Sequence, residues 1–430
     1  MAALAGLLLL TLVLRIAIIV LDGDRLYSDP DAYVRLATML ADGQGFSTAD
    51  GIRPTAYRPV LYPLLLAIPL KLGLSAPTAV VLWNLVSGLT LVLATIGLAK
   101  ECALHRRVCL LAGLLAAADP LMIRYTTEPM TENLCAALLT LSLLLLLRFV
   151  RTLGVRERPG IWATAIGAGT MLGLSALCRP VVLVSCVLLT LTLVVVSRSI
   201  QTESRSMSHR LVWVFFPAVV AAVTVSPWII RNAFEFNALI PATTHGGYTL
   251  LLGNNSEFYD RVVSGMQPAW DGESLVRWQK NLGQQMTKAG VDQSDERAAD
   301  QWMYRQAIRE IGSQPGMAAR AVLLRWKRFW AITPITSGTS LSPIAIYGVA
   351  AWYALAGIGL LSSLLRLRRN PAVLLLWVTV VSFVAVHSVY WTNTRMRAPL
   401  TGILIVLAIT GWKNLTSSSQ PADAGLTAVQ

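Results

Sequence analysis

Long apolar runs separated by short polar segments dominate the chain. Each run approaches the ~20 residues that a helix needs to cross ~30 Å of hydrocarbon. The segments are 2–21, 77–99, 108–124, 130–148, 160–177, 180–197, 211–230, 343–365, 371–390 and 398–413. This pattern predicts an all-α polytopic membrane protein with about 10 transmembrane helices, within a range of roughly 9–12.

Two polar segments are long enough to carry structure, the first outer loop at 22–76 and a second outer loop at 231–342. In the first, Pro30 suits a helix start and Gly43 a helix end. Apolar positions recur between them at helical spacing, which predicts an amphipathic interfacial helix. The apolar run 60–70 is too short to span and predicts a second interfacial helix.

The 231–342 segment is predicted to be mostly helical. Ser294 with Asp295 and Glu296 is typical of a capped helix start, and Gly312 with Pro315 of a helix end. A basic, Trp-rich helix follows over 317–330. We expect one transmembrane domain over 1–413 and a disordered cytoplasmic tail over 414–430.

Composition and charge support a membrane location. The chain is 55% hydrophobic and only 14% charged, against about 25% charged in soluble domains. Its net charge of +13 does not indicate a nucleic-acid partner, because basic residues concentrate in short loops, where they set orientation. These basic loops predict that both termini lie in the cytoplasm and that both long loops lie on the extracytoplasmic side of an inner or plasma membrane. The residues are Lys100, Arg106, Arg107, Arg148, Arg151, Arg156, Arg158, Arg198, Arg205, Arg210, Arg366, Arg368 and Arg369.

The first outer loop contains the strongest candidates for chemistry. Asp29 is a candidate general base for an acceptor hydroxyl, and Asp31 lies two residues further on. The alternative is that Asp29 caps a helix and Asp31 suits its first turn. Arg58 precedes the short apolar helix, at the depth in the membrane where a lipid phosphate sits, and its guanidinium can bind a phosphate with two parallel hydrogen bonds. The alternative is an interfacial arginine whose side chain only extends to the water.

Further candidates come from the ends of the spans. Glu128 and Glu132 lie one helical turn apart and could face a cavity, orient an acceptor, help hold a divalent cation or cap a helix. Basic candidates for phosphate are Arg179, Arg395 and Arg397, although Arg179 also fits a pairing or topology residue. A structural role, in pairing or topology, is favoured for Arg15 inside the first span. A lone histidine, His245, is weak evidence for a metal.

An ordered set of motifs resembles GT-C-type membrane glycosyltransferases, in particular bacterial relatives of the protein O-mannosyltransferases and of the lipid A aminoarabinose transferase. The motifs are Asp29-Pro-Asp-Ala-Tyr33, Tyr57-Arg58-Pro59, Thr127-Glu128-Pro129, Pro227-Trp228, Arg231-Asn232, Thr244-His-Gly-Gly-Tyr248, Leu252-Gly253-Asn254-Asn255 and Arg395-Met-Arg397-Ala-Pro399. The set covers most of the chain in one order.

The resemblance implies an enzyme that moves a sugar from a polyprenyl-phosphate donor to a glycan, lipid or protein acceptor at the extracytoplasmic face. By resemblance Asp29 is the base, Glu128 a second catalytic acid, and Arg58 the ligand of the donor phosphate, with Arg395 and Arg397 as further phosphate ligands. Arg179 is a phosphate candidate from its position between two spans. Other candidate site residues are Asp31, Tyr33, Tyr57, Glu132, His245 and Tyr248. A divalent cation is a candidate cofactor.

A second hypothesis is a transporter or flippase for a lipid-linked sugar. Such a protein would carry internal repeats and broken helices near the midplane of the membrane. The polar residues of this chain gather in the outer loops instead, which favours the enzyme.

Overall fold

A computed structural model describes residues 1–48, 51–153, 160–199, 207–266, 270, 272–333, 343–367 and 370–416. Five of the basic loop residues (Arg156, Arg158, Arg205, Arg368 and Arg369) lie outside the described residues, as does most of the expected tail, 417–430. The described chain is built from helices, and its β-structure is confined to one isolated bridge between Ser47 and Pro54.

The first half of the chain forms helices α1 to α10. Their bounds are α1 Ala2–Leu21, α2 Tyr33–Ala41, α3 Leu61–Lys71, α4 Ala76–Glu101, α5 Arg106–Ala117, α6 Pro120–Arg124, α7 Glu132–Leu153, α8 Ile161–Cys178, α9 Val181–Ser199 and α10 Met207–Phe236. Short 3₁₀ segments lie at Gly23–Tyr27 (η1) and Tyr125–Thr127 (η2).

The second half forms helices α11 to α18. Their bounds are α11 Gly246–Gly253, α12 Ser256–Phe258, α13 Gly272–Lys288, α14 Glu296–Ser313, α15 Pro315–Phe329, α16 Pro343–Ser363, α17 Pro371–Val389 and α18 Thr401–Thr416. A π-helical turn lies at Tyr259–Val263 (η3), and 3₁₀ segments at Leu364–Arg366 (η4) and Thr394–Leu400 (η5).

The prediction of a multi-pass membrane protein is confirmed. Eight helices of the described chain are long and apolar enough to cross a membrane, and α5 with α6 makes a ninth if this pair, bent by 43°, is one span. The bend follows from Pro120, which has no N–H for the helix ladder. The apolar part of helix α9, Val181–Ser197, is shorter than the length required of a candidate span. Each of the ten predicted segments is therefore helical, but fewer than ten are long enough to count as candidate spans.

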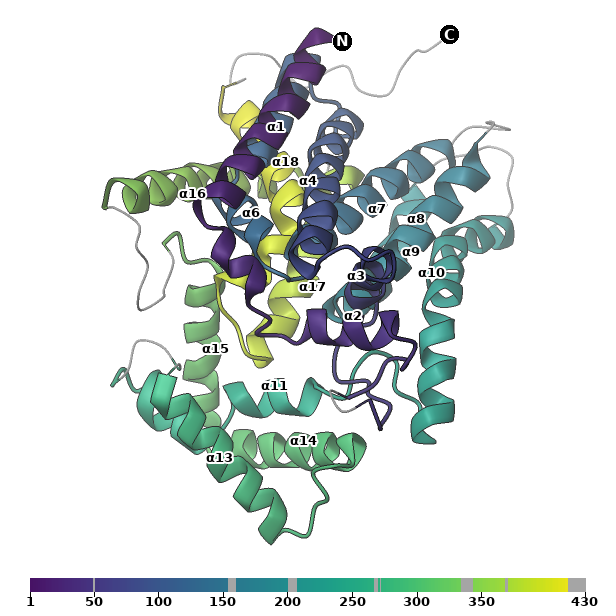
Figure 1. Cartoon of the computed structure of the whole chain (residues 1–430). Helices are drawn as coiled ribbons and strands as arrows, with labels where there is room; N and C mark the ends of the chain where they lie inside the picture. The colour runs from purple at the N-terminus through teal and green to yellow at the C-terminus, as the bar shows by residue number, and fades with distance from the viewer. Residues whose placement is uncertain are drawn as a thin grey trace.

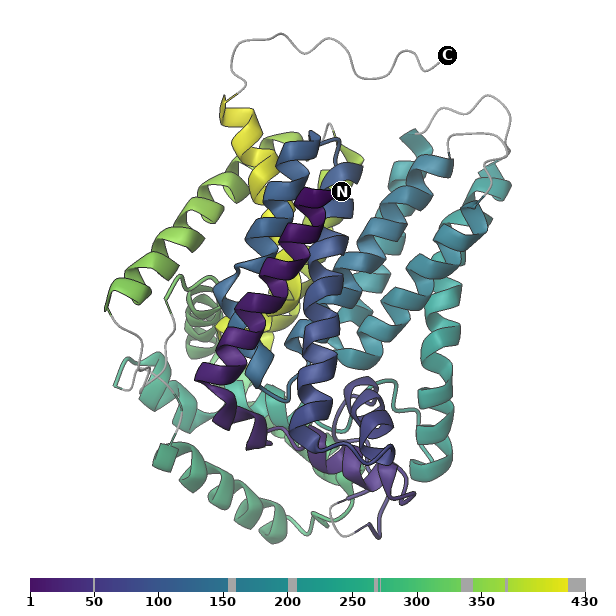
Figure 2. The ribbon, with the colours of Figure 1, turned by 45° about the horizontal axis from the view of Figure 1, so that its top comes forward.

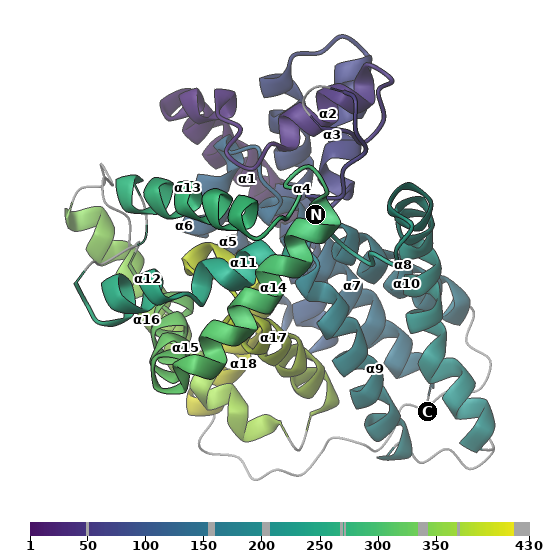
Figure 3. The ribbon, with the colours of Figure 1, turned by 90° about the horizontal axis from the view of Figure 1, so that it is seen from below.

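The long helices form a bundle, and the outer-loop helices cover one end of it (Figure 1). Helices α11, α13 and α14 lie below the bundle, at the same end as α2, whereas α1 begins at the opposite end (Figures 1 and 2). Seen from below, α13 and α14 cross in front of the bundle (Figure 3). The two long polar segments therefore meet at one end, as the basic-loop pattern predicts.

The helix predicted to begin at Pro30 begins later, at Tyr33. Ala32 has φ 60° and ψ 23°, a left-handed conformation that L-residues rarely adopt and that cannot continue a helix. Pro30 and Asp31 therefore form a turn before the helix. This turn lets Asp29 and Asp31 point in different directions.

Four apolar clusters lie in the described chain. The largest lies within the bundle and includes Leu98, Leu139 and Phe383. The second largest lies in the outer layer, which is formed by helices α11 to α15, and includes Trp278, Trp302 and Phe258. The outer layer therefore has its own hydrophobic core. A segment with its own core can hold side chains in fixed positions, which a flexible connection cannot.

Arg15 is a buried charge in the C-terminal half of α1. Its side chain is 0% exposed, and its Nη1 atom donates to the Met122 carbonyl oxygen at 3.1 Å and to Thr126 Oγ1 at 2.9 Å. The Arg15 guanidinium also lies against Gly88, where a Cβ would stand 2.0 Å from Nε. The contacts agree with the structural role favoured from the sequence.

Candidate functional site

A cavity of about 930 Å³ opens between the first outer loop, the outer layer and the ends of the spans. Its wall contains most of the predicted site residues. They are Asp31, Tyr33, Tyr57, Arg58, Arg179, His245, Tyr248 and Arg395.

Asp31 lies between two arginines that come from distant parts of the chain. Its Oδ1 atom accepts from Arg58 Nη2 at 2.9 Å, and its Oδ2 atom accepts from Arg395 Nη2 at 2.5 Å. Arg58 Nε also donates to the Asp31 carbonyl oxygen at 2.9 Å. Burial would raise the pKa of Asp31, but the charges of Arg395, Arg58 and Arg179 outweigh it and lower that pKa. The carboxyl group is therefore ionised at neutral pH.

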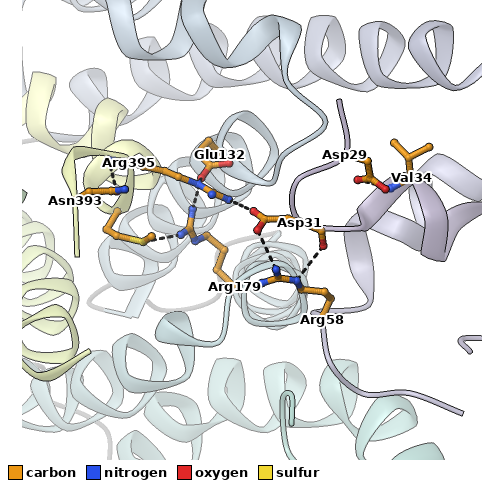
Figure 4. Close-up of polar contacts among 9 residues, drawn as sticks. Asp29, Asp31, Val34, Arg58, Glu132, Arg179, Asn393 and Arg395 are labelled. Atoms are coloured by element: carbon orange, nitrogen blue, oxygen red, sulfur yellow. Dashed lines mark hydrogen bonds and ion pairs between the residues drawn. The ribbon is translucent and has the colours of Figure 1, made fainter. Parts of the chain in front are cut away.

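Glu132 extends the same network at the start of α7. Its side chain is fully buried, and its Oε1 atom accepts from Arg179 Nη1 at 2.9 Å and from Arg395 Nε. Figure 4 shows Arg395 between the two carboxylates, with Arg58 and Arg179 on the outer flanks. Three guanidinium groups thus meet two carboxylates, which leaves an excess of positive charge at the cavity wall.

Local sequence explains how each arginine reaches the cavity. Arg179 precedes Pro180, and a residue before proline avoids the helical region. It is extended, with φ −145° and ψ 119°, so α8 ends at Cys178 and the side chain turns into the gap before α9. Arg58 likewise precedes Pro59, and Asn393 caps the 3₁₀ segment with Arg395 by accepting from its N–H at 3.1 Å.

Asp29 does not share this hollow with Arg58, contrary to the expectation from the sequence. Its carboxylate accepts from the backbone N–H groups of Val34 at 3.1 Å and Arg35 at 2.9 Å, so it caps α2. Figure 4 shows it directed at the start of that helix and away from the ion pairs. The capping alternative describes its contacts, and its catalytic role stays a prediction.

Two further candidates lie away from the cavity wall. Glu128 pairs with Arg25 at 3.1 Å and Arg124 at 3.2 Å. Arg397 donates to the Phe329 carbonyl oxygen at 3.2 Å, and its guanidinium lies 4.3 Å from the ring centre of Tyr353. The sequence indicates that these residues lie near the ends of spans, but the direction of each side chain depends on the irregular backbone before α7 and on the 3₁₀ segment before α18.

A row of three contacting rings lines the cavity beside Arg58, whose guanidinium lies 4.8 Å from the ring centre of Tyr57. The ring centres of Tyr57 and His245 are 4.2 Å apart, and those of His245 and Tyr248 are 4.9 Å apart. Burial and the charge of Arg58 lower the pKa of His245 to about 3, so its imidazole is neutral at neutral pH. Its Nδ1 atom has no hydrogen-bond partner among the described residues.

The sequence reasoning missed Asp300, which lines the cavity from α14. Its Oδ1 atom accepts from the backbone N–H of Gly247 at 2.6 Å. The signal was present, because Asp300 follows Glu296 by four residues within the predicted helix and so shares its face.

Asp300 predicts a pH dependence of stability. Burial raises its pKa from 3.8 to about 6, despite the opposing hydrogen bond from Gly247. Between about pH 4 and 6 the folded protein then holds a proton that the unfolded chain has lost, so the free energy of unfolding falls as the pH rises. The Asp300→Asn variant should lose this slope in thermal unfolding of the detergent-solubilised protein. The exposed Asp260→Asn control should keep it, and an unchanged slope in Asp300→Asn would contradict the assignment.

The paired glycines Gly246 and Gly247 allow α11 to approach α14. A Cβ at Gly247 would lie 2.1 Å from the Asp300 carbonyl oxygen, and one at Gly246 would lie 1.9 Å from the Tyr304 hydroxyl oxygen. Gly247→Ala must therefore push backbone against backbone, and we expect a loss of at least ~1–3 kcal/mol in unfolding free energy. Gly316→Ala has open space around its Cβ and is the matched control in thermal unfolding.

Among the residues that the structure describes, His, Cys, Asp and Glu side chains form no group of three or more suited to a metal ion. The two acidic side chains at the centre of the network, Asp31 and Glu132, are bound by arginines instead.

Part of the chain matches a known family. The family model of the dolichyl-phosphate-mannose-protein mannosyltransferases matches residues 57–230, less than half of the chain. This match includes Tyr57, Arg58, Glu132 and Arg179. No curated protein matches the chain.

Solved structures are similar over nearly the whole chain. An oligosaccharyltransferase of Archaeoglobus fulgidus, tethered to an acceptor peptide, aligns with a TM-score of 0.55 at 14% identity over 96% of this chain and 49% of that one. The AglB enzyme of the same organism, with an inhibitory peptide and a dolichol-phosphate, gives 0.55 at 14% over 99% and 52%. ArnT from Cupriavidus metallidurans, bound to undecaprenyl phosphate, gives 0.44 at 16% over 95% and 78%.

The chain spans about half the length of the oligosaccharyltransferases that it matches. Their low identity shows a shared fold rather than a shared substrate. The resemblance inferred from the ordered motifs is confirmed by the family match and by this fold together. The chain is thus a multi-pass membrane protein with the fold of the GT-C glycosyltransferases.

Proposed function

We propose that the chain is a membrane glycosyltransferase that moves a sugar from a polyprenyl-phosphate donor to an acceptor hydroxyl or phosphate at the extracytoplasmic face. The observation that carries the proposal is the cluster of Arg58, Arg179 and Arg395 on the cavity wall. The guanidinium group binds phosphate oxygens in pairs and keeps its charge beside a membrane. The family match and the dolichol-phosphate bound to AglB support the same class of donor.

The arginines suit the chemistry of the leaving group. When the bond between the anomeric carbon and the phosphate oxygen breaks, the phosphate gains negative charge, and fixed cations stabilise it. A phosphate leaves without an acid to protonate it, so one carboxylate is sufficient to take the proton from the acceptor. A direct displacement of this kind inverts the configuration at the anomeric carbon.

Asp31 is the carboxylate that the geometry favours for this proton. It lines the cavity and is ionised at neutral pH, whereas Asp29 faces the start of α2. Without a donor, Asp31 occupies the hydrogen-bonding groups of Arg58 and Arg395. A donor phosphate would compete for these groups and release the carboxylate beside the reacting carbon.

Arg58→Ala tests the donor site. Removal of one charged pair of hydrogen bonds, worth ~1.5–3 kcal/mol, should weaken the binding of undecaprenyl phosphate by about 10- to 100-fold. The assay measures this affinity in detergent and the transfer of labelled sugar from polyprenyl-phosphate donors to extracted envelope acceptors. Arg35→Ala, at an exposed position of α2, should behave as wild type. Equal affinity in wild type and Arg58→Ala would overturn the phosphate site.

A further inference from the structure

Three side chains on one face of α14 contact three different segments of the cavity wall. Glu296, Asp300 and Tyr304 are spaced by four residues, which aligns them along one side of a helix. Helix α14 lies directly beneath α11 at the outer-loop end of the molecule (Figures 1 and 3). Neither the ion-pair network nor the donor site uses Glu296.

Glu296 binds two segments that are far apart in the chain. Its Oε1 atom accepts from the Thr55 hydroxyl. Its Oε2 atom accepts from the Ala56 N–H at 3.0 Å and from Thr244 Oγ1 at 2.8 Å. The two segments also contact each other directly, because the Thr244 N–H donates to the Ala56 carbonyl oxygen at 2.9 Å.

The residues that follow these contacts enter the cavity. Tyr57 and Arg58 come directly after Ala56, and His245 comes directly after Thr244. The Arg58 guanidinium lies 4.8 Å from the ring centre of Tyr57, whose ring in turn contacts that of His245. A shift of Ala56 relative to Thr244 would therefore move Tyr57 and Arg58 away from His245.

The other two side chains fix the remaining wall. Asp300 accepts from the Gly247 N–H, and the Tyr304 hydroxyl lies 3.3 Å from that of Tyr390 at the end of α17. Helix α14 therefore contacts the first outer loop, the start of α11 and the end of a membrane span along one stripe. Because Asp300 and Tyr304 attach α14 to the rest of the wall, Glu296 is held in a fixed position from which it binds the segments at Ala56 and Thr244.

We infer that Glu296 is a positioning residue, whose carboxylate holds the segment with Arg58 against the segment with His245 and so sets the geometry of the donor site. The inference rests on the proposed function for its effect on donor binding. The chemistry requires an acceptor with two oxygen atoms, because two hydroxyl groups and one N–H donate to this side chain. Glutamine at position 296 would keep the shape of the side chain, but its NH₂ group would face either the Thr55 hydroxyl or the Ala56 N–H and Thr244 hydroxyl.

Hydrogen exchange and donor binding together test the inference. In Glu296→Ala, deuterium uptake should rise in peptides that cover 51–60 and 240–248 and stay unchanged in peptides from α4. The affinity for undecaprenyl phosphate should fall about 10-fold, because several hydrogen bonds worth ~0.5–1.5 kcal/mol each are lost. Glu296→Gln should be intermediate. Glu273→Ala, at an exposed position of α13, is the matched control.

A milder pair of variants covers the case in which Glu296→Ala does not fold. Thr244→Val removes one hydroxyl at nearly constant volume, and Thr244→Ser retains it. Thr244→Val should raise the uptake of 51–60 and weaken binding about 2- to 10-fold, and Thr244→Ser should behave as wild type in both assays. Both variants leave the ion pairs intact.

The two readouts separate this inference from the proposed function. Unchanged uptake in Glu296→Ala and Thr244→Val would overturn the positioning role, as would increased uptake with wild-type affinity. If wild-type protein does not bind undecaprenyl phosphate, the proposed function fails, and the exchange result alone decides whether Glu296 holds the two segments together.

Discussion

The Asp31→Asn variant is expected to lose sugar transfer by about 10²- to 10⁴-fold, the range for removal of a general base. Its affinity for undecaprenyl phosphate should be retained or increased. The change removes a negative charge that competes with the phosphate for Arg58 and Arg395, although Arg395 still contacts Glu132. A loss of transfer without a loss of binding would place Asp31 in the chemical step. The measurement is single-turnover transfer from a labelled polyprenyl-phosphate sugar, alongside binding of the carrier.

Asp29→Asn is the comparison that makes this result informative. The amide oxygen of asparagine can still accept from one N–H at the start of α2, so the cap is weakened rather than removed. We expect a small loss of transfer, which follows thermal stability. The opposite pattern, with transfer lost in Asp29→Asn and kept in Asp31→Asn, would assign the base to Asp29, as the motif resemblance predicts.

Arg395→Ala is expected to have the largest effect on stability. Arg395 bridges Asp31 and Glu132, and Glu132 is fully buried. Truncation of one partner of a buried, hydrogen-bonded charge pair costs ~2–5 kcal/mol, largely because the remaining charge stays away from water. Thermal unfolding in detergent measures the loss. Lysine should restore only part of it, because a single ammonium group lacks the planar shape that contacts both carboxylates.

A double variant separates charge burial from general damage. Glu132→Gln combined with Arg395→Ala removes the carboxylate that Arg395→Ala leaves under-compensated. The double variant should therefore be more stable than Arg395→Ala alone. Equal stability of wild type and Arg395→Ala would contradict the bridging role.

The spans and the outer-loop helices were predictable from the sequence, because both depend on local patterns. Hydrophobic length identified the bundle, and Asp295 accepts from the Ala298 N–H at 3.0 Å, as a predicted helix cap should. The start of α2 was not predictable, since the left-handed conformation of Ala32 is no local preference of alanine.

The centre of the site depended on contacts that no local pattern reveals. Arg58, Arg179 and Arg395 were candidates for phosphate, yet their convergence on Asp31 and Glu132 joins residues up to 364 positions apart. The motif resemblance, together with their place in the same outer loop, suggested Asp29 and Arg58 as the acid–arginine pair. The turn at Ala32 directs Asp29 to the start of α2 and Asp31 to the arginines. Glu128, in the bend before α7, and Arg397, in the 3₁₀ segment before α18, contact other partners.

The buried position of Arg15 has a consequence for biogenesis. The groups that solvate its charge, at Met122 and Thr126, follow it by 107 and 111 residues. When α1 first leaves the ribosome, these groups have not been synthesised, and an unpaired arginine within a membrane span is costly, by ~2.5–3.5 kcal/mol at a helix centre. Stable insertion of α1 should therefore wait for α6, so that the translocon releases the first helices as a group rather than one at a time.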